Sequence, residues 1–556
     1  MSTVPLYTSR LWPPVRPRTG DASASTPDLL HTLGLIARTD ATGVHTLLPL
    51  GLRVHDRLTA IARRAFEERG ALTFAPPTLQ SRTLWDQTGR WDRYRREGAL
   101  LTATSSSGEE MCLAPTSEEI AAATVREHLR SHRDLPVRLS LSTRKFRDEI
   151  SPRGGLMRGR EFTMADAYTF DTGPDTMRDS IDFLNHACTA ALTAMGLTGV
   201  FTAPADGGSI SAGPSTEHLV LANSGQGTIL ACTHCGNRGD GAVLAAHPPP
   251  PDPEPVVNVI AFTLTLPDGT TRPATVAIRS DLHVNPRKVA TATGAAHVDL
   301  IDPARLPEVL GKNAGTLTPW DADNATDVLA LYDLSAADLE LFAISDGNTG
   351  LRAGVRWSGT RGLPALHPSG VDLHQATERS GCGACRQGRY SALRAVEVAH
   401  VFELGTQYAT SMNLHYRGHD GHPTTPWMAC SGIGITRCLQ TAAGLNRDQH
   451  GLRWAPGTGP ADVHLVVLRA DQPAMRDRGE RLARDLTARH VSVLVDDRPQ
   501  PAGDKLRYAR LLGLPHALVL SPDHPDTETE VITRSTGRTT RTDLSHITDR
   551  NPFTHT

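Results

Sequence analysis

The segment from Arg144 to Phe170, RKFRDEISPRGGLMRGREFTMADAYTF, gathers side chains that bind anions. Its charged residues are separated by Pro152, Gly154 and Gly155, which permit a turn and the close approach of a ligand. An arginine fork suits phosphates and carboxylates because it is planar, bidentate and always charged. We therefore predict two strands, KFRDE and GLMRGREF, joined by the loop ISPRGG, that present arginines to an anion. A solvated hairpin with surface ion pairs is the alternative.

Strand alternation brings particular side chains of this segment together. Arg147 and Glu149 can point the same way, and Arg158 and Phe162 share one face of the return strand. Phe162 offers a flat face on which a ring can stack. We expect a binding surface for an anionic ligand that also carries a ring.

Two Cys-x-x-Cys pairs carry a second kind of chemistry. The four residues are Cys232, Cys235, Cys382 and Cys385. Eight cysteines in a chain of 556 residues do not make a disulfide framework, whereas two such pairs have the spacing of a zinc ribbon. The pairs predict a structural zinc site, and four free thiols are the alternative.

Length and composition limit the class of protein. With 556 residues and a net charge of −3, the chain is too long for one compact domain. No run approaches the roughly 20 apolar residues of a membrane span, and the first residues lack the apolar core of a signal peptide. We expect a cytoplasmic protein that does not contact membranes. No P-loop motif is present, which excludes a Walker-type ATPase.

Helical and strand patterns indicate the elements that position these residues. Residues 53–71 have apolar side chains at helical spacing before a glycine, which predicts an amphipathic helix. Beyond the glycine- and proline-rich stretch at 455–460, strand-like and helix-like segments alternate in the order strand, helix, strand, helix, strand. This order predicts a small C-terminal α/β domain.

Four motifs in order resemble one family. CLAPTSEEI, the Arg144–Phe170 segment, VEVAHVFELGTQY and ACSGIGITR are similar to bacterial-type prolyl-tRNA synthetase, a class II aminoacyl-tRNA synthetase. Several long motifs in the right order are more specific than a single short pattern. The resemblance implies an α+β fold with an antiparallel catalytic sheet, an inserted α/β domain and a C-terminal α/β anticodon-binding domain. It assigns residues 1–27 to a flexible N-terminal arm, 28–244 and 382–455 to the catalytic domain, 245–381 to the insertion domain, and 460–556 to the anticodon-binding domain.

The resemblance also implies a role for each matching residue. The residues expected to bind proline are Thr116, Glu118, Arg147, Phe162, His400 and Cys430. Those expected to bind ATP are Arg147, Glu149, Arg158, Phe162, Thr406, Gln407 and Arg437. Catalysis would rest on Arg147, Glu149 and Arg437, and tRNA would meet Arg153 and Lys505. Glu118 and Glu119 equally fit an ordinary helix N-terminus, where acids are favoured, and both interpretations can hold together.

The implied activity is that of a proline–tRNA ligase, which uses ATP and Mg²⁺ to activate L-proline and transfers it to tRNA(Pro). No protein nucleophile is needed, so Cys430 is expected to be a pocket-wall residue. The first motif of this class builds a dimer interface, so a homodimer is implied.

Some positions depart from the family pattern. Ser151 replaces an arginine that would meet tRNA, Ala165 replaces a lysine, and Ser431 replaces a tyrosine. In the insertion, Lys288 matches a family lysine, whereas Asn348 and Leu351 stand in place of the Asp and His used to clear mischarged alanine. We therefore expect weak or absent alanine editing. A paralogue with altered tRNA use, such as an inhibitor-resistant copy or a biosynthetic adenylating enzyme, and a non-catalytic tRNA-binding protein are the alternative functions.

Overall fold

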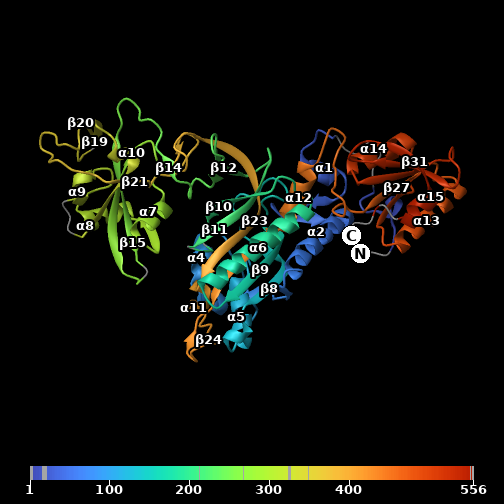
Figure 1. Cartoon of the computed structure of the whole chain (residues 1–556), viewed down its shortest axis with the longest axis horizontal. Helices are drawn as coiled ribbons and strands as arrows, with labels where there is room; N and C mark the ends of the chain where they lie inside the picture. The colour runs from blue at the N-terminus through green and yellow to red at the C-terminus, as the bar shows by residue number, and fades with distance from the viewer. Residues whose placement is uncertain are drawn as a thin grey trace. The chain divides into compact units, whose positions relative to one another are not determined.

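The computed structural model describes residues 4–14, 22–208, 210–211, 213–266, 268–323, 327–348, 350–550 and 553. Two compact units make up the chain (Figure 1). The first unit contains Met1–Thr202, Glu217–Gln226 and Val396–Thr556, and the second contains Ala203–Thr216 and Gly227–Ala395. None of the helices in the described ranges combines the length and apolar character that a membrane span requires.

An antiparallel sheet forms the centre of the first unit, and the predicted α+β class is confirmed. Its strands lie in the order β11-β23-β26-β9-β8, with the short β4 paired in parallel to β8. The bounds are β4 (Leu72–Thr73), β8 (Val137–Phe146), β9 (Glu161–Asp171), β11 (Pro214–Leu221), β23 (Tyr390–Gly405) and β26 (Trp427–Gly434).

Helices pack against this sheet through apolar stripes. In α2 (Pro49–Glu67), Leu50, Val54, Leu58 and Phe66 are buried at helical spacing, so one face meets the core. The helix begins four residues before the predicted start because Pro49 occupies its first turn, where a missing N–H costs nothing. The other helices of this part are α1 (Thr26–Thr32), α3 (Arg82–Asp86), α4 (Arg90–Arg96), α5 (Glu118–His128), α6 (Pro174–Ala194), α11 (Gln407–Ser411) and α12 (Ile435–Leu445).

Small sheets complete this part of the first unit. The remaining strands are β2 (Ile36–Arg38) with β3 (His45–Leu47), β24 (Tyr416–Arg417) with β25 (Pro423–Thr424), and a sheet β5-β7-β6 of Leu79–Ser81, Glu110–Leu113 and Leu101–Thr104.

The predicted hairpin within Arg144–Phe170 is present, but its loop is longer than expected. β8 ends at Phe146 and β9 begins at Glu161, so residues 147–160 form the connection. Arg147, Glu149 and Arg158 therefore lie on a loop and not on paired strands. Gly154 and Gly155, in the middle of this connection, both have positive φ, a backbone conformation that glycine adopts without strain.

The C-terminal part has the predicted strand–helix–strand–helix–strand order. Its elements are β27 (Val463–Val467), α13 (Pro473–Ala488), β28 (Val493–Asp496), α14 (Ala502–Leu512) and β29 (His516–Leu520). A hairpin of β30 (Glu528–Thr533) and β31 (Thr539–Asp543), followed by α15 (Leu544–Arg550), extends the sheet beyond the prediction.

The expected N-terminal arm contains a short strand. Residues 1–3 and 15–21 lie outside the described residues. Leu6 and Tyr7 form β1, which pairs in parallel with Leu494 and Val495 of β28. Thr8 donates from its hydroxyl to Asp496 Oδ1 over 3.2 Å. This strand was missed because two residues are too short for a sequence pattern.

The second unit contains a mixed sheet in the order β17-β15-β16-β18-β21 (Figure 1). Its strands are His297–Leu300, Val257–Thr265, Thr271–Arg279, Leu329–Asp333 and Gly370–Val371. The helices are α7 (Pro286–Thr293), α8 (Leu306–Leu310), α9 (Pro319–Asp323) and α10 (Leu334–Ala337). Short strand pairs are β12 (Gly227–Cys232) with β13 (Arg238–Gly239), β14 (Ala246–His247) with β22 (Gly381–Cys382), and β19 (Phe342–Ser345) with β20 (Leu351–Val355).

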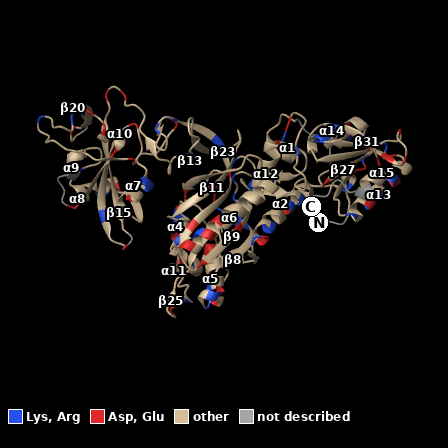
Figure 2. Cartoon of the chain, in the orientation of Figure 1, with Lys and Arg blue, Asp and Glu red and all other residues tan. Residues whose placement is uncertain are grey.

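Charge is spread over both units. Basic and acidic residues are interspersed along their elements, in keeping with the net charge of −3 (Figure 2).

Candidate active site

Thr116 and Glu118 form the start of a buried polar pocket. Glu118 is the first residue of α5 and is 2 % exposed, so it is both a helix N-terminal acid and a buried carboxylate. The Thr116 hydroxyl donates to Glu118 Oε2 over 2.6 Å. Burial opposes ionisation of Glu118, but Arg90 and this hydroxyl outweigh it and lower its pKa. A buried anion of this kind can receive an ammonium group.

Arg90 at the start of α4 is a site residue that sequence reasoning missed. Its Nη1 lies 3.1 Å from Glu118 Oε2 and 3.0 Å from Glu119 Oε1. The guanidinium stands 4.4 Å from the ring centre of Tyr94 and 5.2 Å from that of Tyr408. Arg90 is 28 residues from Glu118 in the chain, and no spacing pattern links them.

Lys145 forms a second buried ion pair beneath the pocket. Its Nζ lies 2.7 Å from Asp166 Oδ2 and donates to Ser117 Oγ over 2.5 Å. Both ionic side chains are almost fully buried. Burial raises the pKa of Asp166 even though Lys145 favours its charged form. Lys145 thus ties strand β8 to the segment that carries Thr116.

Cys430 lies on β26 at the wall of the same pocket. Its Sγ stands 3.8 Å from Glu118 Oε1. Burial, with the charges of Glu118 and Asp166, raises the pKa of the Cys430 thiol well above its usual value. The thiol therefore stays protonated, as a wall residue and not a nucleophile would.

The arginine-rich loop lies beside Phe162 of β9. The Arg147 guanidinium stands 5.2 Å from the centre of the Phe162 ring. Within the described residues, no carboxylate comes within 4 Å of Arg147. Arg158 Nε, by contrast, donates to Glu149 Oε2 over 2.5 Å, and these contacts help lower the pKa of Glu149 against partial burial. Arg147 is thus available to an anionic ligand, and Glu149 holds Arg158.

Arg437, in the first turn of α12, joins this loop to β23. Its Nε donates to Met157 O over 3.0 Å, and its Nη1 donates to Glu397 O over 2.7 Å and lies 3.2 Å from Glu397 Oε2. Partial burial opposes the charge of Glu397, yet His400, Arg437 and Arg147 lower its pKa to about 2. His400 Nδ1 is 3.1 Å from Glu397 Oε1. Glu397 was not singled out from the sequence.

Gln440, one turn further along α12, fixes the arginine-rich loop. Its Oε1 accepts from Leu156 N over 2.8 Å, and its Nε2 donates to Gly154 O over 2.7 Å. A Cβ on Gly155 would come within 2.6 Å of Gln440 Oε1. The side chain is buried, so both of its bonds go to the loop backbone. Sequence reasoning missed Gln440 because a single glutamine in a helix has no distinctive pattern.

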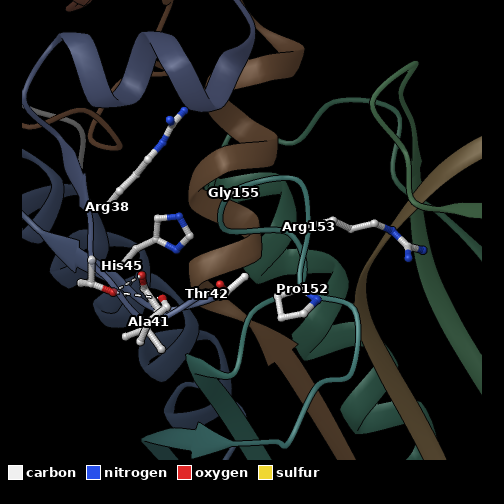
Figure 3. A pocket seen from close by; sticks show the side chains of 10 residues that line it. Arg38, Ala41, Thr42, His45, Pro152, Arg153 and Gly155 are labelled. Atoms are coloured by element: carbon white, nitrogen blue, oxygen red, sulfur yellow. Dashed lines mark hydrogen bonds between the residues drawn. The ribbon is translucent and has the colours of Figure 1, made fainter.

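A turn between β2 and β3 supports the outer side of the same loop. Arg160 N donates to Gly43 O over 2.8 Å, and a Cβ on Gly43 would lie only 2.6 Å from Pro152. A cavity of about 220 Å³ opens here (Figure 3). His45 points into it, whereas the Arg153 side chain points away and donates to Gln226 Oε1 over 2.8 Å. Arg153 is exposed, as a contact with tRNA requires.

Thr406 and Gln407 lie where β23 gives way to α11. Thr406 is half-buried and Gln407 is exposed. The next residue, Tyr408, is buried against Arg90. The predicted ATP residues at this position are therefore attached to the same element that encloses the Glu118 pocket.

Lys505 does not fit the predicted contact with tRNA. Its side chain is fully buried, and Nζ donates to Val467 O over 2.5 Å and to Asp496 O over 3.3 Å. Burial lowers its pKa. Lys505 therefore joins α14 to two strands of the C-terminal sheet, and the prediction that it meets tRNA is corrected to a structural role.

The four predicted cysteines come together in the second unit. Cys232 Sγ lies 3.7 Å from Cys385 Sγ, and Cys235 Sγ lies 3.8 Å from Cys382 Sγ. All four sulfurs lie within 4.8 Å of one another, and none is in a disulfide. The two Cys-x-x-Cys segments thus form one cluster, although Cys235 and Cys382 are 147 positions apart in the sequence.

A further polar cluster surrounds Lys288 in the second unit. Lys288 Nζ lies 2.7 Å from Asp372 Oδ1. His374 Nδ1 lies 3.1 Å from Asp333 Oδ2 and 3.4 Å from Asp372 Oδ1. Asn348 and Leu351, at the β19–β20 turn, are exposed. Asp333, Asp372 and His374 were not predicted, because Asp333 lies 41 residues before His374 in the chain.

The antiparallel sheet and the arginine loop define a class II aminoacyl-tRNA synthetase. The model of the class II tRNA synthetase core domain (G, H, P, S and T) matches residues 101–444, and the anticodon-binding domain model matches residues 462–550. Within this class, the chain belongs to the proline–tRNA ligase family, as its curated relatives show.

Two of these relatives illustrate the similarity. A proline–tRNA ligase of Magnetococcus marinus is 31 % identical over 541 residues, covering 92 % of this chain and 92 % of that protein. A proline–tRNA ligase of Geobacter sulfurreducens is 31 % identical, covering 96 % of this chain and 95 % of that protein.

Solved structures agree in fold. The prolyl-tRNA synthetase of Cryptosporidium parvum with L-proline and AMP has a TM-score of 0.57 at 13 % identity, covering 96 % of this chain and 76 % of that chain. The Giardia lamblia enzyme with prolyl-adenylate also has a TM-score of 0.57 at 13 % identity, covering 94 % and 74 %. At 13 % sequence identity, these structures show a similarity of fold alone.

Proposed function

We propose that this protein is a proline–tRNA ligase that activates L-proline with ATP and transfers it to tRNA(Pro). Two groups carry the proposal: Glu118, a buried carboxylate whose pKa is lowered, and Arg147, which has no carboxylate partner in the described part of the chain. Their segments adjoin, because Phe146 N donates to Ala114 O over 3.2 Å. One group suits the ammonium of proline, and the other suits its carboxylate and the ATP α-phosphate.

The proposed roles follow from these positions. Glu118 and Thr116 hold the ammonium, and Cys430 and His400 close the pocket. Arg147 brings the proline carboxylate to the α-phosphate, which it attacks with release of pyrophosphate. Phe162 stacks on adenine, while Arg158, held by Glu149, and Arg437 contact the phosphates. Thr406 and Gln407 border the nucleotide. The rate then comes from positioning and charge stabilisation.

We infer that Mg²⁺ accompanies ATP. Glu217, Glu397 and His400 offer ligand atoms within 4.8 Å of one another, and their carboxylates are of the type that Mg²⁺ prefers. The donor set therefore fits the ion, and Glu217 and Glu397 would hold it. When bound, Mg²⁺ neutralises phosphate charge.

We also infer a structural zinc ion between the four cysteines. Four sulfurs about 2.3 Å from a tetrahedral zinc ion stand about 3.8 Å apart, which agrees with the 3.7 and 3.8 Å sulfur separations. Backbone N–H groups of His234 and Gly388 also point at cysteine sulfurs, over 3.4 Å each. Elemental analysis should find about one zinc per chain, lost in Cys235→Ser and kept in Cys188→Ala. Absence of zinc from the unsubstituted protein would favour free thiols.

Further parts of the proposal concern assembly, location and editing. A cytoplasmic homodimer is the expected state. We propose that Arg153, exposed on the loop, contacts tRNA. Alanine editing is expected to be weak, because Asn348 and Leu351 replace the Asp and His of the family pattern.

One pair of assays tests the function. ATP–pyrophosphate exchange with proline should be measured beside charging of purified tRNA(Pro). Both activities together are the expected result. Exchange without charging would indicate a paralogue that passes prolyl-adenylate to another acceptor. A lack of exchange with every amino acid would instead leave a non-catalytic tRNA-binding protein.

A further inference from the structure

The buried charges around Glu118 do not balance. The carboxyl groups of Glu118, Glu119 and Asp166 face two cations, Arg90 and Lys145, and all five residues are at most 2 % exposed. With every group ionised, this set carries one net negative charge. A buried charge without a partner is costly, so the set favours a ligand that brings one cation.

Asp166 has a cation of its own, although its Oδ1 accepts no hydrogen bond from the described residues. Lys145 Nζ lies 2.7 Å from Asp166 Oδ2, and Lys145 makes no ion pair with another carboxylate among the described residues. The Tyr168 hydroxyl donates to the same Oδ2 over 3.1 Å. The excess charge therefore belongs to Glu118 and Glu119, which share Arg90.

Arg90 is divided unequally between these two carboxylates. Its Nη1 lies 3.0 and 3.1 Å from the two oxygens of Glu119 but contacts only Oε2 of Glu118, at 3.1 Å. Its Nη2 is occupied by the Tyr94 hydroxyl. Thr88 donates to Glu119 Oε1 over 2.8 Å. Both oxygens of Glu119 are thus engaged by charged or hydroxyl donors.

Glu118 retains one oxygen with only a weak neighbour. Its Oε2 accepts from Thr116 and Arg90, whereas its Oε1 faces only the Cys430 thiol at 3.8 Å among the described residues. A thiol is a weak donor, so Oε1 has the capacity for a charged hydrogen bond. We propose that Glu119 is a positioning residue that holds Arg90, and so leaves Glu118 Oε1 to bind the substrate ammonium.

The inference rests on the proposed proline site and adds a specific consequence. Without the Glu119 charge, Arg90 would pair wholly with Glu118, and the substrate ammonium would compete with a buried guanidinium. Only ligands with a cationic nitrogen should then bind more weakly. The affinity for a ligand of the same shape without that charge should not depend on Glu119.

The experiment compares L-proline with tetrahydrofuran-2-carboxylate, which has an oxygen in place of the ammonium nitrogen. In Glu119→Gln, we expect the Kd and KM for proline to rise by at least about tenfold, since a charged hydrogen bond is weakened. The affinity for tetrahydrofuran-2-carboxylate should stay within about twofold, and kcat for exchange should fall much less than kcat/KM. Glu127→Gln, on the exposed side of the same helix, is the matched control.

Other outcomes separate this inference from the proposed site. Equal weakening of both ligands, or of neither, in Glu119→Gln would overturn the inference. Glu118→Gln distinguishes the two ideas, because unchanged proline binding in that variant would remove the proposed proline site itself. If Glu119→Gln fails to fold, Thr88→Val removes the hydroxyl that fixes Glu119 Oε1. It should weaken proline binding in the same selective way, and an equal effect on both ligands would again overturn the inference.

Discussion

The pocket around Glu118 and the arginine-rich loop hold their charges in different ways. Around Glu118, the cations Arg90 and Lys145 are buried and already paired with carboxylates. On the loop, Arg147 is half-buried and has no ion pair among the described residues. Charges of the first kind support the fold as well as the ligand, whereas a charge of the second kind serves the ligand. Substitutions on the two sides should therefore have different readouts.

Arg147→Ala should have the greatest effect on activity and almost none on stability. Loss of a positioned charge at the reacting phosphate costs on the order of 10³-fold in rate. We expect this loss in ATP–pyrophosphate exchange, with a thermal melting temperature close to that of the unsubstituted protein.

The control for Arg147 is its neighbour Arg144, which pairs with Glu161 on the surface and is 71 % exposed in its side chain. Arg144→Ala should keep exchange within about twofold, since exposed ion pairs contribute little. A large fall in melting temperature for Arg147→Ala would show that the loop arginine is structural after all.

The same contrast explains how much could be predicted from the sequence. The arginine-rich hairpin, the two Cys-x-x-Cys pairs and the C-terminal domain were predictable, because each shows a pattern within a short stretch of sequence or a long family motif, although the strands of the hairpin end earlier than predicted. Arg90 and Gln440 were not predictable, because their partners lie on other elements and only the folded sheet brings them together. Lys505 matched a family lysine, but the match could not reveal that its side chain is buried.

Lys145→Met tests the buried side. Removing Lys145 leaves the Asp166 carboxylate buried without a cation, which typically costs about 3–5 kcal/mol. We expect a loss of that order in the free energy of unfolding, measured by urea denaturation. Arg144→Met, one residue earlier on β8, should be nearly neutral. If both substitutions lower the free energy of unfolding equally, burial is not what makes the charges around Glu118 more important for stability than exposed charges.

Gln440→Leu tests how the exposed loop is held in place. The substitution preserves size but removes both bonds to the backbone of residues 154 and 156. Because one loop N–H and one C=O lose their partners, we expect the observed loop conformation to be less stable by about 1–3 kcal/mol. The KM for ATP should rise by about tenfold or more while the KM for proline changes little.

A parallel rise in both KM values would contradict this expectation for Gln440→Leu, since it would mean that the loop and the pocket move together. Thr193→Val is a suitable control, because the exposed Thr193 hydroxyl donates only to Thr189 O inside helix α6.

Asp448→Asn extends the contrast to an ion pair outside the site that is one-third exposed. Arg534 contacts both oxygens of Asp448, at 2.6 and 2.7 Å, and these hydrogen bonds lower the pKa of Asp448 to about 2 despite partial burial. A carboxyl group whose pKa is lower in the folded state stabilises the protein above its unfolded pKa of about 3.9. That contribution disappears as the pH falls from about 4 toward 2.

We expect Asp448→Asn to lower the free energy of unfolding by only about 1 kcal/mol at pH 7, because solvent screens the pair. The difference from the unsubstituted protein should shrink in denaturation curves recorded below pH 4. A cost as large as that of Lys145→Met would mean that pairing geometry, and not burial, governs both pairs. A constant difference between pH 7 and pH 3 would instead show that the asparagine disturbs packing, since the loss of an ionised carboxylate must follow its titration.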